Sequence, residues 1–173
     1  MKIILSITLI VLAMNVSAQN LNKKIHDKVH DKEILINTCT RAGITSFPEF
    51  KEMYDPIYGA YIPDATVMIE LKTLIKKEKI KIVFGTWCGD SKVNVANFFK
   101  ILDALHFNEK DVELIAVDGD KKAENGLIDG LDIKLVPTFI VYDKKGLELG
   151  RIVEGPQTTL EGDLLKIFKK KSL

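Results

Sequence analysis

A short apolar run, Ile80 to Gly85, lies between two segments that have the hydrophobic spacing of helices. Because this run is apolar without alternation, it predicts a strand that is buried on both faces, as in the centre of a parallel sheet. The segment that follows Asp64 and the segment Ser91–His106 each repeat apolar residues as amphipathic helices do. A helix–strand–helix order of this kind predicts an α/β protein with right-handed crossovers.

The later part of the chain adds strands to the predicted sheet. Val112–Val117 is another apolar run, and Thr138–Tyr142 and Leu147–Val153 are two more, joined by a short turn that predicts an antiparallel hairpin. A short helix is expected at Ala123–Asp129, and Thr158 with Glu161 predicts a capping box for a last helix. These elements predict a mixed central sheet flanked by helices, with helices on both faces.

The N-terminal residues have the pattern of a secretory signal. Lys2 is followed by the apolar run Ile3–Met14 and by small residues at Val16-Ser17-Ala18, which predicts cleavage after Ala18. The alternative is an uncleaved anchor, although the run is shorter than the roughly 20 residues of a membrane span. We therefore expect export to the periplasm or the medium, without stable membrane insertion after cleavage.

Length and charge restrict the architecture and the partners. With 173 residues the chain suits one domain, which we divide into a signal segment 1–18, an N-terminal extension 19–62 and a main domain 63–173. The chain has 25 basic and 24 acidic residues, and this balance argues against nucleic acid or an anionic membrane as the main partner. We expect a monomer.

The extension is expected to be helical or irregular. Leu21, Ile25 and Val29 have helical spacing, so the tail is predicted to become a helix. His26 and His30 are four residues apart and would share a face of that helix, either as two ligands of a metal or as part of a solvated surface. No third ligand follows nearby, and no metal site is predicted. The aromatic residues of the segment 47–61 are expected to cover the sheet.

Cys88 follows the central strand at the predicted start of a helix. The free N–H groups and partial positive charge of a helix N-terminus favour a thiolate, which is the nucleophilic form of cysteine. Trp87, the one tryptophan of the chain, would lie beside the sulfur. The alternative is an inert cysteine buried at the end of a strand. Pro137 directly precedes another strand, and we expect a cis bond after Val136.

These two stretches resemble the thioredoxin family. Trp87-Cys88-Gly89-Asp90-Ser91-Lys92 is similar to its active-site run Trp-Cys-Gly-Pro-Cys-Lys, and Val136-Pro137-Thr138 is similar to its cis-proline loop. The resemblance covers about 64–173 and extends to exported bacterial proteins with a Trp-Cys-Gly-Asp-Ser site. It implies a thioredoxin-like fold and thiol or disulfide substrates, either proteins or small molecules, with no metal or organic cofactor. It also implies a substrate groove, formed by Trp87, Gly89, Asp90, Val136, Pro137 and Thr138.

The sequence departs from that family at the second cysteine. Ser91 occupies the position of the resolving thiol, Asp90 replaces the proline, and the buried acid of thioredoxins falls near Ile82, where no acid is present. Ser91 could donate a hydrogen bond to the Cys88 thiolate, whereas the charge of Asp90 disfavours it.

Four functional alternatives follow. Cys88 could act as a single thiol that an external thiol releases, with Ser91 as its catalytic support, or Cys39 could be the resolving thiol or form a static disulfide with Cys88. The remaining alternative is a non-catalytic module that holds an extended peptide or client protein in the same groove.

Overall fold

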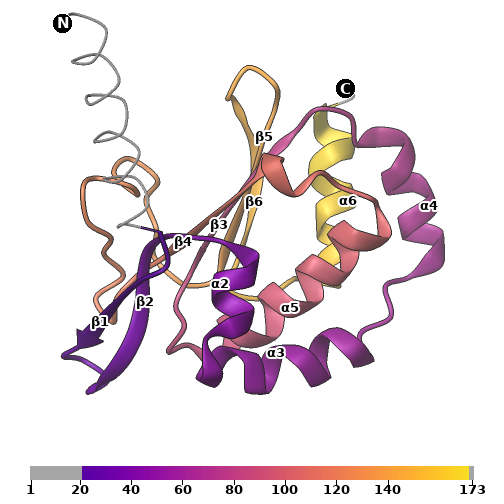
Figure 1. Ribbon diagram of the computed structural model, residues 1–173. Helices are drawn as coiled ribbons and strands as arrows, with labels where there is room; N and C mark the ends of the chain where they lie inside the picture. Colours follow the sequence, from indigo (N-terminus) through magenta and orange to yellow (C-terminus); the bar gives the residue numbers. More distant parts are fainter. Residues whose placement is uncertain (1–20, 172–173) are drawn as a thin grey trace, which may run out of the picture.

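The computed structural model describes residues 21–171, so the predicted signal segment 1–18 lies outside the described residues. Six strands form one sheet in the order β1-β2-β4-β3-β5-β6 (Figure 1). β3 and β4 are parallel, and the other neighbouring strands are antiparallel, which confirms the predicted mixed sheet. The strands are β1 (Lys23–Asp27), β2 (Lys32–Cys39), β3 (Lys79–Phe84), β4 (Val112–Ala116), β5 (Thr138–Tyr142) and β6 (Glu148–Val153).

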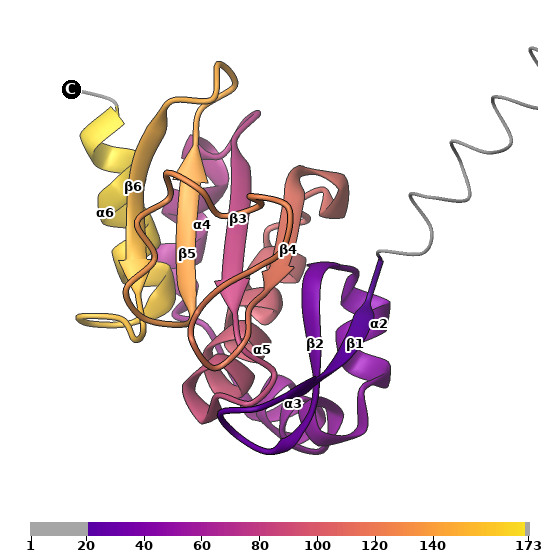
Figure 2. The same ribbon diagram turned by 90° about the vertical axis from the view of Figure 1, so that its left-hand side faces the viewer.

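The helices gather on one face of the sheet (Figures 1 and 2). This arrangement corrects the expectation of helices on both faces, because a long loop of residues 118–137 crosses the second face instead (Figure 2). A 3-10 turn, Glu109–Asp111, precedes β4. The helices of the described part are α2 (Arg41–Ser46), α3 (Pro48–Ala60), α4 (Ala65–Leu74), α5 (Gly89–Ala104) and α6 (Leu160–Lys171).

The central strand β3 faces two hydrophobic clusters, as its apolar sequence predicts. Ile82 and Phe84 belong to the main cluster under the helices, where Phe98 of α5 stacks on Phe139 of β5 at 4.4 Å between ring centroids. Val83 points to the opposite face and packs in a smaller cluster under the long loop. Burial on both faces therefore fixes β3, and with it the position at which α5 begins.

The N-terminal extension begins with a β-hairpin, so the helix predicted over Leu21, Ile25 and Val29 is wrong. Ile25 of β1 lies opposite Ile34 of β2, and β2 in turn pairs with β4. The helical spacing is weak, whereas the apolar and β-branched residues of β2 strongly favour a strand. These residues therefore extend the sheet at the edge of β4. The turn ends at Asp31, which has a φ of 51°.

The long loop contains no helix, so the helix expected at Ala123–Asp129 is also wrong. Asn125 and Gly126 have φ values of 56° and 70°, and two left-handed residues in a row stop a right-handed helix. The loop is fastened to the hairpin by Asn37 and Glu124. The amide of Asn37 donates to the Glu124 carboxylate at 2.7 Å, and its oxygen accepts from the Glu124 N–H at 2.9 Å.

The ends of two helices test the predicted caps. Asp64 caps α4 as expected, since its carboxylate accepts from the N–H groups of Thr66 and Val67. The capping box predicted for α6 is wrong, because Thr159 is the residue that accepts from the third N–H of the helix, at 3.1 Å. Glu161 is buried and instead accepts from the backbone N–H of Asp64 at 3.0 Å, which ties α6 to α4.

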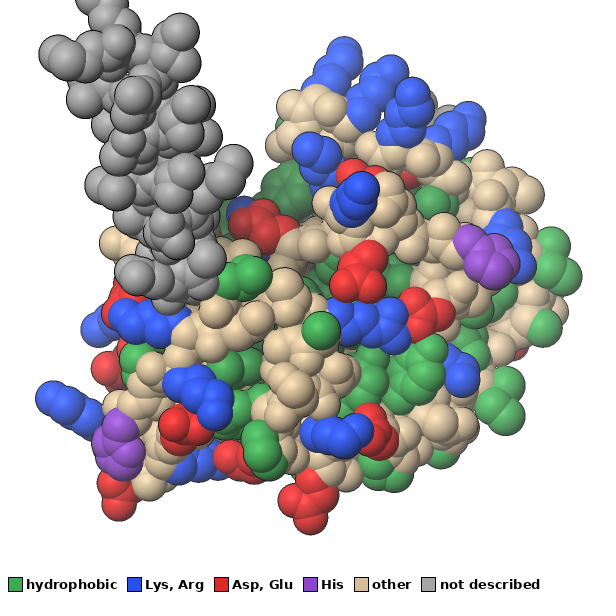
Figure 3. All heavy atoms as spheres, viewed as in Figure 1, with side chains coloured by type: hydrophobic (Ala, Val, Ile, Leu, Met, Phe, Trp, Pro, Cys, Tyr) green, Lys and Arg blue, Asp and Glu red, His purple; other side chains and the backbone are tan. Residues whose placement is uncertain are grey.

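The surface carries both charge signs, in keeping with the balanced composition. Basic side chains gather at the top of Figure 3, over the turn between β5 and β6 and over the end of α6. Lys166 pairs with Asp163 within α6, and Lys169 pairs with Glu70 of α4. Cations near a helix C-terminus complement its dipole, so this cluster has a local structural explanation.

Arg41 of α2 joins α5 to the aromatic side chains of α3. Its guanidinium donates to both carboxylate oxygens of Asp103 at 2.7 and 2.6 Å, and it lies over the ring of Phe99 at 4.4 Å. The Tyr58 hydroxyl donates to the same carboxylate at 2.6 Å. Burial acts to raise the pKa of Asp103, but the hydrogen bonds from Arg41 and Tyr58 bring that pKa below its ordinary value.

We expect the Asp103→Asn variant to lower the free energy of unfolding at pH 7 by about 1–2 kcal/mol. The Asp103 side chain is 39% exposed, so solvent screening keeps the loss below that of a fully buried pair. Because its pKa is lowered by folding, its contribution is present above the unfolded value of about 3.9 and is lost as the pH falls through the lower folded value. Urea unfolding should therefore show the difference from wild type shrinking from pH 7 to about pH 2.

Asp55→Asn is the matched control. Asp55 pairs with Lys51 one turn away on the exposed side of α3, so its loss should cost at most about 0.5 kcal/mol. Equal losses in the two variants, or a difference for Asp103→Asn that persists unchanged at low pH, would contradict the assigned role of the Arg41 cluster.

Candidate thiol site

Cys88 stands between β3 and α5, as the sequence predicts. It is the N-cap residue of α5, and its own N–H donates to the Gly85 carbonyl at 3.1 Å, which closes the turn out of β3. The sulfur is partly exposed and donates to the Val136 carbonyl at 3.4 Å. The cysteine and the proline loop, which are 48 residues apart in sequence, therefore meet at one point of the surface.

The proline loop enters β5 beside this sulfur. The Val136–Pro137 peptide bond is cis, and Val136, Pro137 and Thr138 are all buried. The Thr138 hydroxyl donates to the Leu135 carbonyl at 2.7 Å, which holds the loop closed at its base. The Leu135 side chain is 41% exposed, so an apolar surface lies next to the residues that face Cys88.

Ser91 is fully buried in the first turn of α5. Its Oγ accepts a hydrogen bond from the Gly85 N–H at 3.1 Å. Among residues 21–171, Gly85 is the hydrogen-bond partner of the Ser91 hydroxyl, and no hydrogen bond joins Ser91 to the Cys88 sulfur. Ser91 thus fixes the turn in front of the cysteine, whereas Gly89 and Asp90 are exposed at the start of the helix.

Trp87 is held on two sides. Its indole N–H donates to the Val117 carbonyl at 3.0 Å, and its ring stacks on His30 with centroids 4.3 Å apart and planes inclined by 19°. Gly85 lies directly against the indole, where a Cβ atom would be 2.6 Å from the ring. The position of Trp87 beside Cys88 therefore depends on a glycine, on the residue that follows β4 and on the N-terminal hairpin.

The N-terminal hairpin contributes residues that sequence reasoning missed. His30 donates its backbone N–H to the buried Asp27 carboxylate, and its ring Nδ1 lies 2.7 Å from the same carboxylate. Thr86, also fully buried, accepts from the Leu35 N–H of β2 at 3.1 Å. The spacing of His26 and His30 was the available signal, but a helical interpretation placed both on one face. In the hairpin, His26 pairs instead with the exposed Asp31.

Cys39 lies elsewhere. It is 6% exposed within the main cluster, and burial raises the pKa of its thiol to about 12. It pairs with Leu114, which pairs with Ile82, so two strand spacings of about 4.8 Å each separate it from β3. A disulfide requires a Cα separation of roughly 4.4–6.8 Å, and both cysteines are free thiols. The structure therefore does not bring Cys39 to Cys88, either as a resolving thiol or as a static bridge.

A buried lysine follows Ser91. Lys92 is 6% exposed and pairs with Glu49 of α3 at 2.8 Å, and Glu49 also accepts from Lys32 at 2.7 Å. Burial acts to raise the pKa of Glu49, but these two hydrogen bonds hold it below its ordinary value. The network joins α5, α3 and β2 behind the Cys88 turn, so it supports the site from the helical side.

The described part of the chain offers no metal centre and no membrane span. Residues 21–171 contain no group of three or more His, Cys, Asp or Glu side chains placed to hold a metal ion. Among the helices in that range, none is long and apolar enough to cross a membrane.

Several solved structures of low sequence identity are similar to this chain. A crystal structure of an HIV epitope scaffold is 19% identical, with 72% of this chain and 85% of that chain covered and a TM-score of 0.52. A protein of unknown function from Pseudomonas aeruginosa is 18% identical, with 77% and 91% covered and a TM-score of 0.52. Mitochondrial thioredoxin 3 from Saccharomyces cerevisiae, in its oxidized form, is 19% identical, with 68% and 99% covered and a TM-score of 0.37.

No curated protein matches the sequence. A family model described as thioredoxin matches residues 48–166. The matched range runs from α3 into α6, so it includes the Cys88 turn and the proline loop that faces it and leaves out the N-terminal hairpin. Over more than half of its length, therefore, the chain belongs to the thioredoxin family.

Proposed function

We propose that this protein carries out thiol–disulfide exchange with Cys88 as its single nucleophile. Membership of the thioredoxin family supports thiol–disulfide chemistry in general. The observation that carries the proposal is the placement of a partly exposed sulfur at the N-terminus of α5, 3.4 Å from the Val136 carbonyl. Position 91 is a serine engaged with Gly85, and the second cysteine is buried two strands away.

In the first step, the Cys88 thiolate attacks one sulfur of a substrate disulfide. The substrate S–S bond breaks, a mixed disulfide forms with Cys88, and the other substrate sulfur leaves as a thiolate. The helix N-terminus supplies partial positive charge at the attacking sulfur. The exposed Asp90 in the first turn opposes part of that effect.

In the second step, another thiolate attacks the substrate sulfur of the mixed disulfide. This thiolate comes from the substrate itself, which gives isomerisation, or from an external thiol, which gives exchange with that thiol. Either attack returns Cys88 as a thiolate, so the enzyme undergoes no net oxidation. Trp87, next to Cys88 in the chain, and the exposed Leu135, next to Val136, offer apolar surface suited to a segment of unfolded protein.

The proposed setting is outside the cytoplasm, where disulfides persist. The apolar run after Lys2 and the small residues before Ala18 support export to the periplasm or the medium. We propose that the protein works there as a monomer on protein or small-molecule disulfides.

Covalent capture tests the proposal. The reduced protein is mixed with glutathione disulfide, the reaction is stopped with acid, and the adduct is counted by mass spectrometry. Wild type should carry one glutathione that dithiothreitol removes, and Cys88→Ser should carry none. Cys39→Ala is the control and should behave as wild type, because the buried Cys39 thiol stays protonated. Unchanged adduct formation in Cys88→Ser would overturn the proposal.

The same variant tests the second candidate, a non-catalytic module. The engagement of Ser91 with Gly85 rather than with Cys88 favours it, since a site without a resolving partner can hold a client without turnover. A module of this kind would bind a reduced unfolded protein equally well as wild type and as Cys88→Ser. The exchange proposal instead expects wild type to capture covalently an unfolded protein that contains disulfide bonds, and expects this capture to fall to background in Cys88→Ser.

A further inference from the structure

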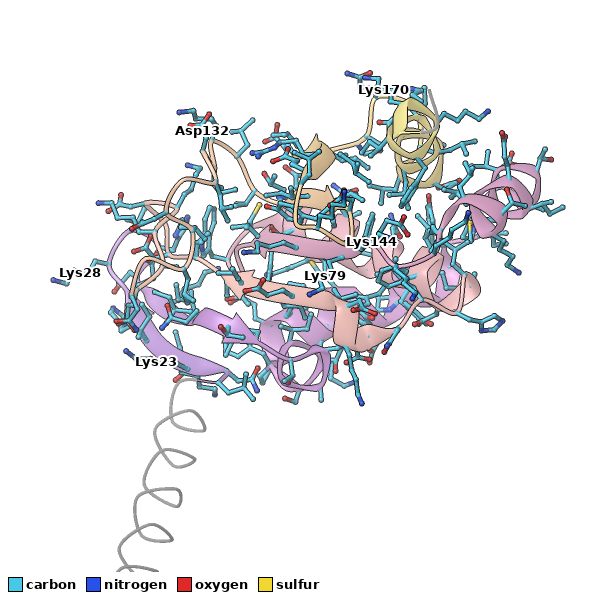
Figure 4. The ribbon with its side chains drawn as sticks, turned by 90° about the horizontal axis from the view of Figure 1, so that it is seen from above. Lys23, Lys28, Lys79, Asp132, Lys144 and Lys170 are labelled. Carbon is cyan, nitrogen blue, oxygen red and sulfur yellow. The ribbon has the colours of Figure 1, made fainter. Side chains whose placement is uncertain are left out.

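The turn of the β1–β2 hairpin lies against the thiol site. Viewed from above, the end of the hairpin that carries Lys28 reaches the long loop that carries Asp132 (Figure 4). His30, two residues after Lys28, stacks on Trp87, which directly precedes Cys88 in the chain. This hairpin lies outside the residues 48–166 that match the family model.

The hairpin turn is fixed by contacts from three directions. Asp27 is 4% exposed and accepts from the His30 N–H at 2.9 Å and from the Gly119 N–H at 3.1 Å. A Cβ atom at Gly119 would lie 2.5 Å from Val29 and 2.8 Å from the His30 ring, so the loop backbone touches the turn. The imidazole is therefore clamped between a buried carboxylate, the loop and the indole.

The Asp27 carboxylate is charged although it is buried. Burial acts to raise the pKa of Asp27, but hydrogen bonds from Gly119 and His30 lower it overall. The carboxylate is therefore a strong acceptor for the His30 N–H, and the ring Nδ1 lies 2.7 Å from it, which holds the imidazole where it stacks on the indole.

We propose that the Asp27–His30 pair is a positioning pair of the thiol site, which holds the Trp87 indole as a fixed wall beside Cys88. The proposal rests on the exchange function for Cys88, but its first test needs no redox chemistry. His30 acts through Trp87 and does not contact the substrate disulfide.

Tryptophan fluorescence tests the clamp directly, because Trp87 is the one tryptophan of the chain. The His30 ring covers one face of the indole, so His30→Ala should shift the emission maximum to longer wavelength. His30→Phe keeps a stacked ring and should keep the emission of wild type. His26→Gln, a change at an exposed histidine of the same hairpin, should also keep it. An emission spectrum of His30→Ala identical to that of wild type would overturn the proposal.

Access and kinetics then separate positioning from a merely structural role. In His30→Ala, acrylamide should quench Trp87 more strongly, and the KM for a fluorescently labelled glutathione disulfide should rise roughly 3- to 10-fold at unchanged kcat. His30→Phe should restore both values at pH 8. If His30→Ala leaves both unchanged, the pair does not position Trp87. Loss of exchange in Cys88→Ser is read separately, so failure of either proposal is identifiable.

Discussion

A Ser91→Cys variant should convert the single-thiol site into a two-thiol site. Cys88 is the N-cap of α5 and position 91 lies in its first turn, where side chains three residues apart are neighbours about 5–6 Å apart at Cβ. A small shift would bring them to the roughly 3.5–4.5 Å at Cβ that a disulfide needs. The new thiol would attack the mixed disulfide from within the molecule. We expect the lifetime of the glutathione adduct to fall by roughly 100-fold or more, because an oriented intramolecular thiol has a high effective concentration.

The measurement is an acid-quenched time course of adduct mass. In the variant, the adduct should be replaced by a protein with an internal disulfide, whose mass is two hydrogens below that of the reduced variant. Loss of the Ser91 bond to Gly85 should cost about 1 kcal/mol of stability. Thr73→Cys is the control, since it adds an exposed thiol on α4 before β3 begins, and its adduct should persist as in wild type. A persistent adduct in Ser91→Cys would show that position 91 cannot reach Cys88.

Gly85→Ala should damage the site with a single methyl group. The added Cβ would lie 2.6 Å from Cε2 of Trp87 and 2.7 Å from its Nε1. The indole must move, which breaks its bond to the Val117 carbonyl and its stack on His30. We expect the free energy of unfolding to fall by about 2–3 kcal/mol, the sum of overpacking and a lost hydrogen bond.

Gly59→Ala is the matched control with the opposite sign. Gly59 lies inside α3, where an added Cβ has no atom within 4 Å. Alanine should therefore stabilise the protein by about 0.5–1 kcal/mol through helix propensity. Urea unfolding measures both variants, and the emission of Trp87 reports the local change. A Gly85→Ala protein as stable as wild type, with unshifted emission, would contradict the close packing described for the turn.

Elements whose signals are local could be predicted from the sequence. Thr138–Tyr142 is a strand with the predicted bounds, and Asp64 is the predicted cap of α4. Both follow from rules that operate within a few residues: β-branched and aromatic content for the strand, and a carboxylate facing free N–H groups for the cap. The placement of Cys88 between β3 and α5 follows in the same way from the apolar run that precedes it.

Features that depend on distant partners could not be predicted in this way. β1 and β2 are strands because β2 pairs with the edge of β4. The helical spacing of Leu21, Ile25 and Val29 contains no information about β4, which lies more than 70 residues later in the sequence. The capping box predicted at Thr158 is absent because the Glu161 carboxylate accepts from the N–H of Asp64, the N-cap of α4, rather than from its own helix. His30 was seen only as a neighbour of His26, since its stack on Trp87 spans 57 positions of sequence.

The hairpin also determines the order in which the chain can assemble. The hydrogen bond between Asp27 and Gly119 spans 92 residues of sequence, and the one between Asn37 and Glu124 spans 87. A chain made from its N-terminus must therefore expose the apolar segment of β2 until β4 and the loop have been synthesised. Contacts of such long range form slowly, so we expect the first strands synthesised to be the last ones buried. In nascent chains that end before Gly119, the hairpin turn would lack its hydrogen bond to the loop, so Trp87 would not be held in place beside Cys88.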